Sequence, residues 1–425
     1  MFTDPPRLVE RIARRFDESK IVDTYSLIRP GMASAGSLAG LLAHPQLLVE
    51  MKSVGMPENA MGPDKHPDEQ VKSALPYLQK VRNTSTGWRF FRILNDLFDF
   101  TEKSINESDW QTLAKTVAER SSQPEWAGEV LAERAHIDAL AMPLSHADAA
   151  DAGLGIRPHY YLDATRLLAK QQSHGKKRGA DESYIESLAK QLGGTCRDHS
   201  HLMKRVNAWL AGAYSDKARF TSVRLPMKFT FRAPDEDAVN QLLDRASGDI
   251  ALTNEETEIV IHAVAWAMLA WHHDNHKTVQ IPTTGHSPFQ PTTCPAAIAK
   301  FYANFPSAQF VIMPGVSEMS GRFCEIAARS PNIAVAGFGS GGFVTDVIAR
   351  ELSLRLQTVP AIKLAACQSH AGNVEWTYAN LQVLRRGISR CLATLIEDDY
   401  IHENDVPAIL NQILNSSPAK LYQLG

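Results

Sequence analysis

The 425-residue sequence contains no C-x-x-C cysteine pair and no stretch of about 20 apolar residues, the length that spans a bilayer. Its five cysteines are widely spaced and odd in number, so neither a disulfide framework nor a thiolate zinc site is indicated, and a reducing compartment is favoured. The most apolar segment, residues 259–271, is short and includes His262. We therefore interpret it as a core helix.

Clustered basic charge is also scarce. The formal net charge is −3, and the basic run Lys176-Lys177-Arg178 lies between glycines, which indicates a solvated loop. Nucleic acids and acidic membranes are bound through clustered Lys and Arg, so neither is predicted as a partner. The N-terminus has no apolar signal core, and acidic residues interrupt its arginines. We expect a cytoplasmic protein.

The alternation of short apolar runs with amphipathic segments is the strongest pattern, and it is clearest from about residue 276 onward. Continuous apolar strands separated by helices are typical of a parallel sheet covered on both faces. Eight strands are the number that closes a (β/α)8 TIM barrel, which is the α/β fold class we predict. The predicted strands are residues 21–24, 136–142, 159–162, 219–225, 276–282, 308–314, 332–338 and 361–367.

Residues 57–133 do not fit a single crossover between two strands, because they contain several helical segments. We predict a helical insertion subdomain here, after the first βα unit, with residues 1–56 and 134–425 forming the barrel. The helices predicted in and just after the insertion are residues 68–80, 87–98, 107–118 and 126–134. Those predicted late in the barrel are residues 295–305, 318–329, 344–356 and 375–396.

Functional groups in a parallel barrel project from the carboxyl ends of its strands, so the candidate site is sought there. Asp23 and Ser369 also stand at strand ends. The candidate catalytic residues are His370, His286, Glu318 and Asp163. The candidate substrate-binding residues are Tyr25, Tyr161, Arg224, Lys228, Gly339, Ser340 and Gly341. Capping of the following helix is the alternative role for Asp163.

Residues 337–342 (GFGSGG) match G-x-G-x-x-G between a predicted strand and a helix, where backbone N–H groups bind phosphate. No acidic residue follows at the offset of about 20 residues that ribose recognition requires. We expect this loop to hold a phosphate or carboxylate and not a dinucleotide.

Two groups of closely spaced histidines are candidate metal sites. Cys196, His199 and His201 are close in sequence, but a helix capped by Thr195 would keep them from converging. His272, His273 and His276 follow the core helix, and the helix macrodipole favours histidine there without a metal. We predict no metal ligand in either group.

Several stretches resemble the uronate (glucuronate) isomerase family of the amidohydrolase superfamily. The likeness extends over most of the chain and includes residues 38–55, 88–100, 223–231, 305–314, 337–343 and 375–422. The resemblance implies a (β/α)8 barrel with a helical insertion after the first strand. It also implies aldose–ketose isomerisation of hexuronic acids, by proton transfer between C1 and C2.

The site residues depart from the family pattern. The family's His-x-His metal pair falls on Tyr25 and Leu27, and its paired tryptophans fall on the glycines 341–342. Tyr161 stands in place of a substrate-binding arginine, and His370 in place of an aspartate. The resemblance therefore implies a divergent member, for which no cofactor is predicted. A divalent metal such as zinc would need replaced ligands.

Three functions remain open from the sequence. The first is a uronate-isomerase-like barrel that acts on or binds a sugar acid, with His370 as general base and His286 or Glu318 as its partner. The second is an inactive relative that binds a small anion or has a structural role. The third is a metal-dependent hydrolase of the superfamily with one metal on His286 and His370. Whether the chain forms a homo-oligomer is not defined by the sequence.

Overall fold

The computed structural model describes residues 7–424, except residues 30, 103, 150–152, 170–182, 227–228, 230–231, 249, 284–294 and 340–342. Its eight strands form one sheet, and each pairs in parallel with the next along the chain. They are β1 (Ile21–Asp23), β2 (Ile137–Pro143), β3 (Arg157–Asp163), β4 (Ala218–Ser222), β5 (Thr278–Pro282), β6 (Gln309–Met313), β7 (Ile333–Ala336) and β8 (Leu364–Ala365). The predicted (β/α)8 barrel is confirmed.

The barrel closes between the segments that follow β1 and β8. Thr24 N donates to Cys367 O (3.2 Å), His370 N donates to Tyr25 O (3.0 Å), and Leu27 N donates to Ala371 O (3.0 Å). This ladder brings residues 25 and 370, which are far apart in sequence, to the same end of the barrel.

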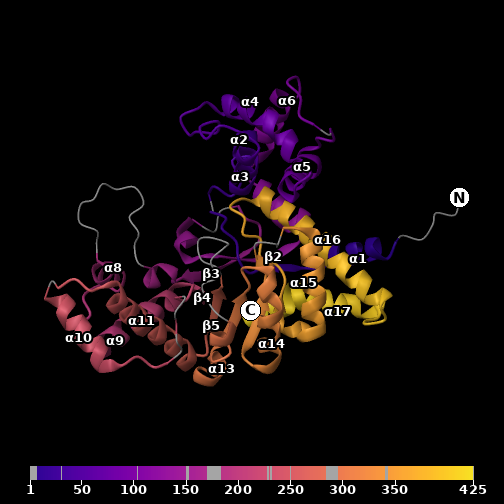
Figure 1. Cartoon of the computed structure of the whole chain (residues 1–425). Helices are drawn as coiled ribbons and strands as arrows, with labels where there is room; N and C mark the ends of the chain where they lie inside the picture. Colours follow the sequence, from indigo (N-terminus) through magenta and orange to yellow (C-terminus); the bar gives the residue numbers. More distant parts are fainter. Residues whose placement is uncertain are drawn as a thin grey trace.

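The outer layer consists of helices (Figure 1). They are α1 (Leu8–Asp17), α8 (Tyr184–Gln191), α9 (His199–Asp216), α10 (Glu236–Ser247), α11 (Asn254–Asp274), α12 (Pro295–Ile298), α13 (Phe301–Asn304), α14 (Ser317–Arg329), α15 (Thr345–Thr358), α16 (Val374–Glu397), α17 (Val406–Asn411) and α18 (Ser417–Leu421). In the described parts of the chain, none of the helices is apolar over a length that would cross a membrane.

Several predicted elements differ in their bounds from the structure, and two of them lie late in the chain. The helix predicted at 295–305 is divided into α12 and α13 by a turn at residues 299–300. The strand predicted at 361–367 begins with a 3-10 turn, Ala361–Lys363, because Lys363 N donates back to Pro360 O (2.9 Å). Only Leu364–Ala365 pairs with β7.

A helical lobe follows β1 and lies at one end of the barrel, beside the start of α16 (Figure 1). It contains α2 (Leu38–Leu42), α3 (Pro45–Ser53), α4 (Pro67–Leu78), α5 (Ser85–Phe98) and α6 (Trp110–Ser121). The chain returns to β2 through α7 (Trp126–Gly128) and a π-helical turn, Glu129–Arg134. Because α2 and α3 pack against α4 and α5, the lobe also includes helices that precede residue 57.

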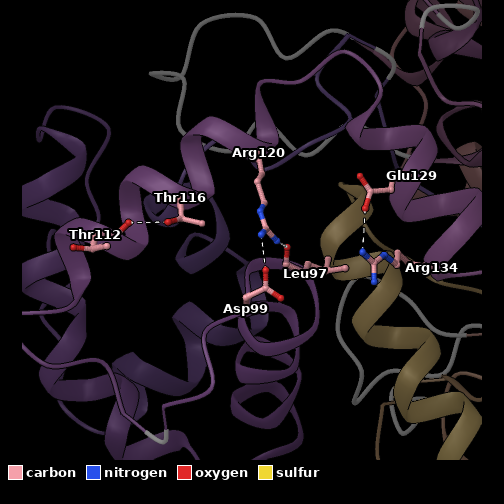
Figure 2. A network of polar contacts seen from close by, with 7 residues as sticks. All are labelled: Leu97, Asp99, Thr112, Thr116, Arg120, Glu129 and Arg134. Carbon is pink, nitrogen blue, oxygen red and sulfur yellow. Dashed lines mark hydrogen bonds and ion pairs between the residues drawn. The ribbon is translucent and has the colours of Figure 1, made fainter.

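Polar contacts join α5 to α6 within this lobe. Asp99 ends α5 in the left-handed conformation, with φ of 55°. Arg120 of α6 donates to Leu97 O (2.6 Å) and pairs with the Asp99 carboxylate, as Figure 2 shows. One arginine therefore fixes the end of α5 against α6.

The C-terminal segment fills the opposite, amino-terminal end of the barrel. Tyr422 is fully buried in the interior, its ring is 4.6 Å from that of Phe220, and its hydroxyl donates to Gln280 Oε1 (2.7 Å). Thr278 Oγ1, at the start of β5, donates to Leu421 O (2.7 Å). Small residues on the inner face of the strands, such as Ala334, leave room for this segment.

Candidate functional site

Three predicted site residues meet at the carboxyl ends of β1, β3 and β8. The ring centroids of Tyr25 and Tyr161 are 5.1 Å apart with an interplanar angle of 19°, and those of Tyr25 and His370 are 4.7 Å apart. Tyr161 in turn stacks on Phe220 below it (5.3 Å). We call Tyr25, Tyr161 and His370 the mouth cluster. Tyr161 is buried beneath Tyr25, so of these three residues only Tyr25 and His370 present accessible surface at the mouth.

Asp23 positions the backbone of this cluster. Its carboxylate is fully buried, and Oδ1 accepts hydrogen bonds from Tyr25 N (3.1 Å) and Ser369 N (3.0 Å). Oδ2 has no hydrogen-bond partner among the described residues. Burial raises the pKa of Asp23. A single side chain thus joins the two segments that carry Tyr25 and His370.

Hydrogen bonds through Asn380 link the mouth to the helical lobe. Asn380 of α16 donates to Ser369 O (2.7 Å) and accepts from Arg89 of α5. The Arg89 guanidinium is buried over the rings of Phe343 (4.5 Å) and Trp376 (5.4 Å). Burial lowers the pKa of Arg89 to about 10, so it remains charged at neutral pH. The backbone next to His370 is therefore held by contacts that extend into the lobe.

Arg224 supplies a positive charge beside the mouth cluster. It is half-buried just after β4, and its Nε is buried with no hydrogen-bond partner among the described residues. His370 lies at the mouth, where desolvation by the surrounding protein, and then the charge of Arg224, lower its pKa to about 4. Burial raises the pKa of both Tyr25 and Tyr161. At neutral pH the site thus combines a neutral imidazole, two protonated phenols and one cation.

The other described candidates have different surroundings. Asp163 is exposed. Its Oδ1 accepts from Thr165 N (3.0 Å) at the start of the 3-10 helix Thr165–Leu168, so Asp163 caps the helix that follows, which is the alternative role given above. Glu318 is exposed in the first turn of α14. Within the described residues, no hydrogen bond or ion pair links Glu318 to His370.

Gly339 lies at the wall of the mouth with φ of +60°. A Cβ at this position would be 2.3 Å from Pro314 O, so the loop requires glycine to pass this close to the segment after β6. His286, Lys228, Ser340 and Gly341 lie outside the described residues.

In the group of Cys196, His199 and His201, the residue that caps the helix differs from the prediction. The cap of α9 is Asp198, whose Oδ1 accepts from His201 N (2.7 Å), so the prediction of Thr195 as the cap is wrong. A carboxylate is a stronger acceptor for the helix N–H groups than a hydroxyl. His201 Nε2 accepts from Arg205 Nε (3.1 Å).

His272 of the second group is a buried structural residue. Its Nδ1 is 2.6 Å from Met268 O, to which it donates, and its Nε2 accepts from Thr221 Oγ1 (2.8 Å). Burial lowers the pKa of His272 to about 4. In the unfolded chain this imidazole has a pKa of about 6.5. Between pH 4 and pH 6.5 the unfolded state therefore binds more protons than the folded state.

We expect His272 to make the fold acid-sensitive. Its contribution to the free energy of unfolding is complete above pH 6.5 and falls by about 3 kcal/mol as the pH is lowered to about 4. Urea unfolding followed by circular dichroism at pH 7.5 and pH 4.5 measures this. The loss should be smaller in His272→Gln than in the wild type, and an equal loss in both proteins would contradict the assignment.

Within the ranges that the structure describes, no three His, Cys, Asp or Glu side chains converge as metal ligands. Leu27 provides no donor atom, and of the Asp23 carboxylate oxygens Oδ1 accepts from two backbone N–H groups while Oδ2 has no partner among the described residues.

The roles of Asn380 and Arg89 are not evident from the sequence. Both lie in helices with ordinary amphipathic patterns, and nothing local to either residue marks a contact with Ser369. An arginine on the apolar face of α5 was the one available signal, because a charge placed there needs buried partners.

Comparisons with known proteins support the fold. No protein-family model matches the sequence, and no curated protein matches it. Among solved structures, glucuronate isomerase from Caulobacter crescentus superimposes with a TM-score of 0.82 at 15% identity, over 100% of this chain and 96% of that chain. Uronate isomerase from Thermotoga maritima gives 0.78 at 13% identity, over 98% of each chain. Uronate isomerase from Bacillus halodurans gives 0.72 at 13%, over 98% and 96%. The chain therefore has the uronate isomerase fold along its whole length.

Proposed function

We propose that the chain is a uronate-isomerase-like barrel protein that takes a sugar acid at the mouth of the barrel. The observation that carries the proposal is the half-buried Arg224, whose Nε lacks a partner among the described residues, beside stacked aromatic rings. A guanidinium pairs with a ligand carboxylate, and aromatic rings pack on the apolar face of a sugar. The likeness to solved isomerases of uronates supports the same ligand class.

Aldose–ketose isomerisation is the second candidate property. The neutral His370 can accept the proton that leaves the sugar carbon, and the neighbouring Tyr25 hydroxyl can donate to the carbonyl oxygen. An imidazole with a pKa of about 4 is a weak base at neutral pH. We propose that ligand binding is the principal property of the mouth, with turnover slower than a base tuned near pH 7 would allow. The hypothesis of a metal-dependent hydrolase requires His286 as a metal ligand. No observation on the described residues favours this hypothesis.

Calorimetric titration tests the proposal. We expect the wild type to bind D-glucuronate in preference to neutral D-glucose, and Arg224→Met to lose about tenfold or more in glucuronate affinity, because a charge-assisted hydrogen bond contributes about 1.5–3 kcal/mol. Arg322→Met, on the exposed face of α14, is the matched control and should bind like the wild type. Equal affinity of the Arg224→Met variant, or equal binding of glucose, would remove the proposal.

A further inference from the structure

A cavity of about 710 Å³ opens at the amino-terminal end of the barrel, away from the mouth cluster. It is lined by residues at the starts of β1, β2 and β3 and by the C-terminal segment, including Ile137, Pro158 and Leu424. Tyr161 stacks on Phe220 and Phe220 packs edge to face with Tyr422, and these rings fill the barrel between this cavity and the mouth. Its volume is within the range of about 300–1,000 Å³ that is typical of small-molecule sites. We call it the basal cavity.

The lining of the basal cavity is apolar on one part of its surface. Val22, Ala139, Leu154, Ile156 and Leu424 contribute hydrocarbon to it. The alanine at position 139 faces the barrel interior, where a larger side chain would occupy the space. A short hydrocarbon chain can pack on this part of the lining.

One charged residue of the lining, Arg157, lacks an ion-pair partner among the described residues. Glu18 pairs with Arg15 (3.1 Å), and Lys20 pairs with Asp138 (3.1 Å). Arg157, exposed at the start of β3, forms no ion pair with a carboxylate of the described residues. The rim of the basal cavity thus carries an uncompensated guanidinium within the described structure.

His159 adds an unused hydrogen-bonding group next to this charge. It lines the cavity with only 5% of its surface exposed, and its Nε2 has no partner among the described residues. Burial, then Arg219 and Arg157, lower the pKa of His159 to about 4, so the ring is neutral at pH 7. The two arginines show that the electrostatic environment of the ring is positive. A buried polar atom without a partner is unusual in a folded protein and is satisfied when a ligand supplies one.

We propose that the basal cavity binds a medium-chain organic monoanion, with the carboxylate at Arg157 and His159 and the hydrocarbon chain on Val22, Ala139 and Ile156. This site is separate from the mouth and does not depend on the function proposed there. Each buried methylene contributes about 0.8 kcal/mol, so affinity should rise about fourfold per methylene from hexanoate to octanoate.

Titration of the full chain with octanoate tests the inference. Because Leu424 lines the cavity, any purification tag belongs at the N-terminus. We expect saturable binding of octanoate at one site and no binding of acetate at the same concentrations. Arg157→Met should weaken octanoate binding about tenfold, and Arg157→Lys should restore part of it.

Two controls separate this site from the mouth. Arg157 is exposed, so Arg157→Met should keep the wild-type melting temperature and its affinity for D-glucuronate. Arg224→Met should bind octanoate as the wild type does. The inference is overturned if the wild type shows no saturable octanoate binding, if Arg157→Met binds octanoate as tightly as the wild type, or if binding is lost in Arg224→Met instead.

Discussion

Replacement of Tyr422 by alanine should lower the free energy of unfolding by about 4 kcal/mol. The ring is fully buried in the barrel, packs on Phe220 at 4.6 Å, and donates its hydroxyl hydrogen to Gln280 Oε1. Its loss would leave a cavity lined by small residues that cannot collapse into it, because the strands are fixed by their ladders. The shift of the urea midpoint, followed by circular dichroism, measures the effect.

Tyr422→Phe is the matched control. It keeps the ring and removes one hydrogen bond, while Gln280 Oε1 still accepts from Gln368 Nε2 (3.2 Å), so we expect a loss of about 1 kcal/mol. Similar small losses in Tyr422→Ala and Tyr422→Phe would show that the C-terminal segment does not stabilise the interior of the barrel.

Glu375 should be equally important where the helical lobe meets the barrel. Its fully buried carboxylate accepts from Ser34 Oγ (2.6 Å), Trp126 Nε1 (2.9 Å) and Ala35 N (3.0 Å). Glu375→Ala leaves all three donors without an acceptor, and each buried unsatisfied donor costs about 1–3 kcal/mol. We expect a total loss of about 3–5 kcal/mol in the free energy of unfolding, measured by urea denaturation.

Glu375→Gln separates the hydrogen bonds from the packing. The amide oxygen can still accept from Ser34 and Trp126, which share Oε1, whereas its NH2 group would face the Ala35 N–H. A loss of about 1–2 kcal/mol follows. If the alanine variant were as stable as the glutamine variant, these three hydrogen bonds would not hold the loop at residues 34–35 to α16.

Most of the fold is predictable from local pattern. Continuous apolar strands such as 308–314 and amphipathic segments such as 318–329 have periodicities that depend on neighbouring residues alone, and both are present as β6 and α14. The division of the helix at 295–305 was not predictable in this way, since a turn at residues 299–300 interrupts an otherwise helical pattern.

Part of the candidate site was predictable for a topological reason. Because the carboxyl ends of all strands in a parallel barrel meet at one end, Tyr25, Tyr161 and His370 had to lie near one another once the strands were placed. The hydrogen bond from Ser369 N to Asp23 and the one from Arg89 to Asn380 were not predictable, because each joins residues hundreds of positions apart. The basal cavity was missed because its residues lie at the amino-terminal ends of the strands.

A crystal structure of the protein soaked with D-glucuronate tests the central claim most directly. The account predicts the sugar at the mouth of the barrel, with its carboxylate within hydrogen-bonding distance of the Arg224 guanidinium and its ring against Tyr25. Glucuronate bound elsewhere, with Arg224 making no contact to it, would contradict the account.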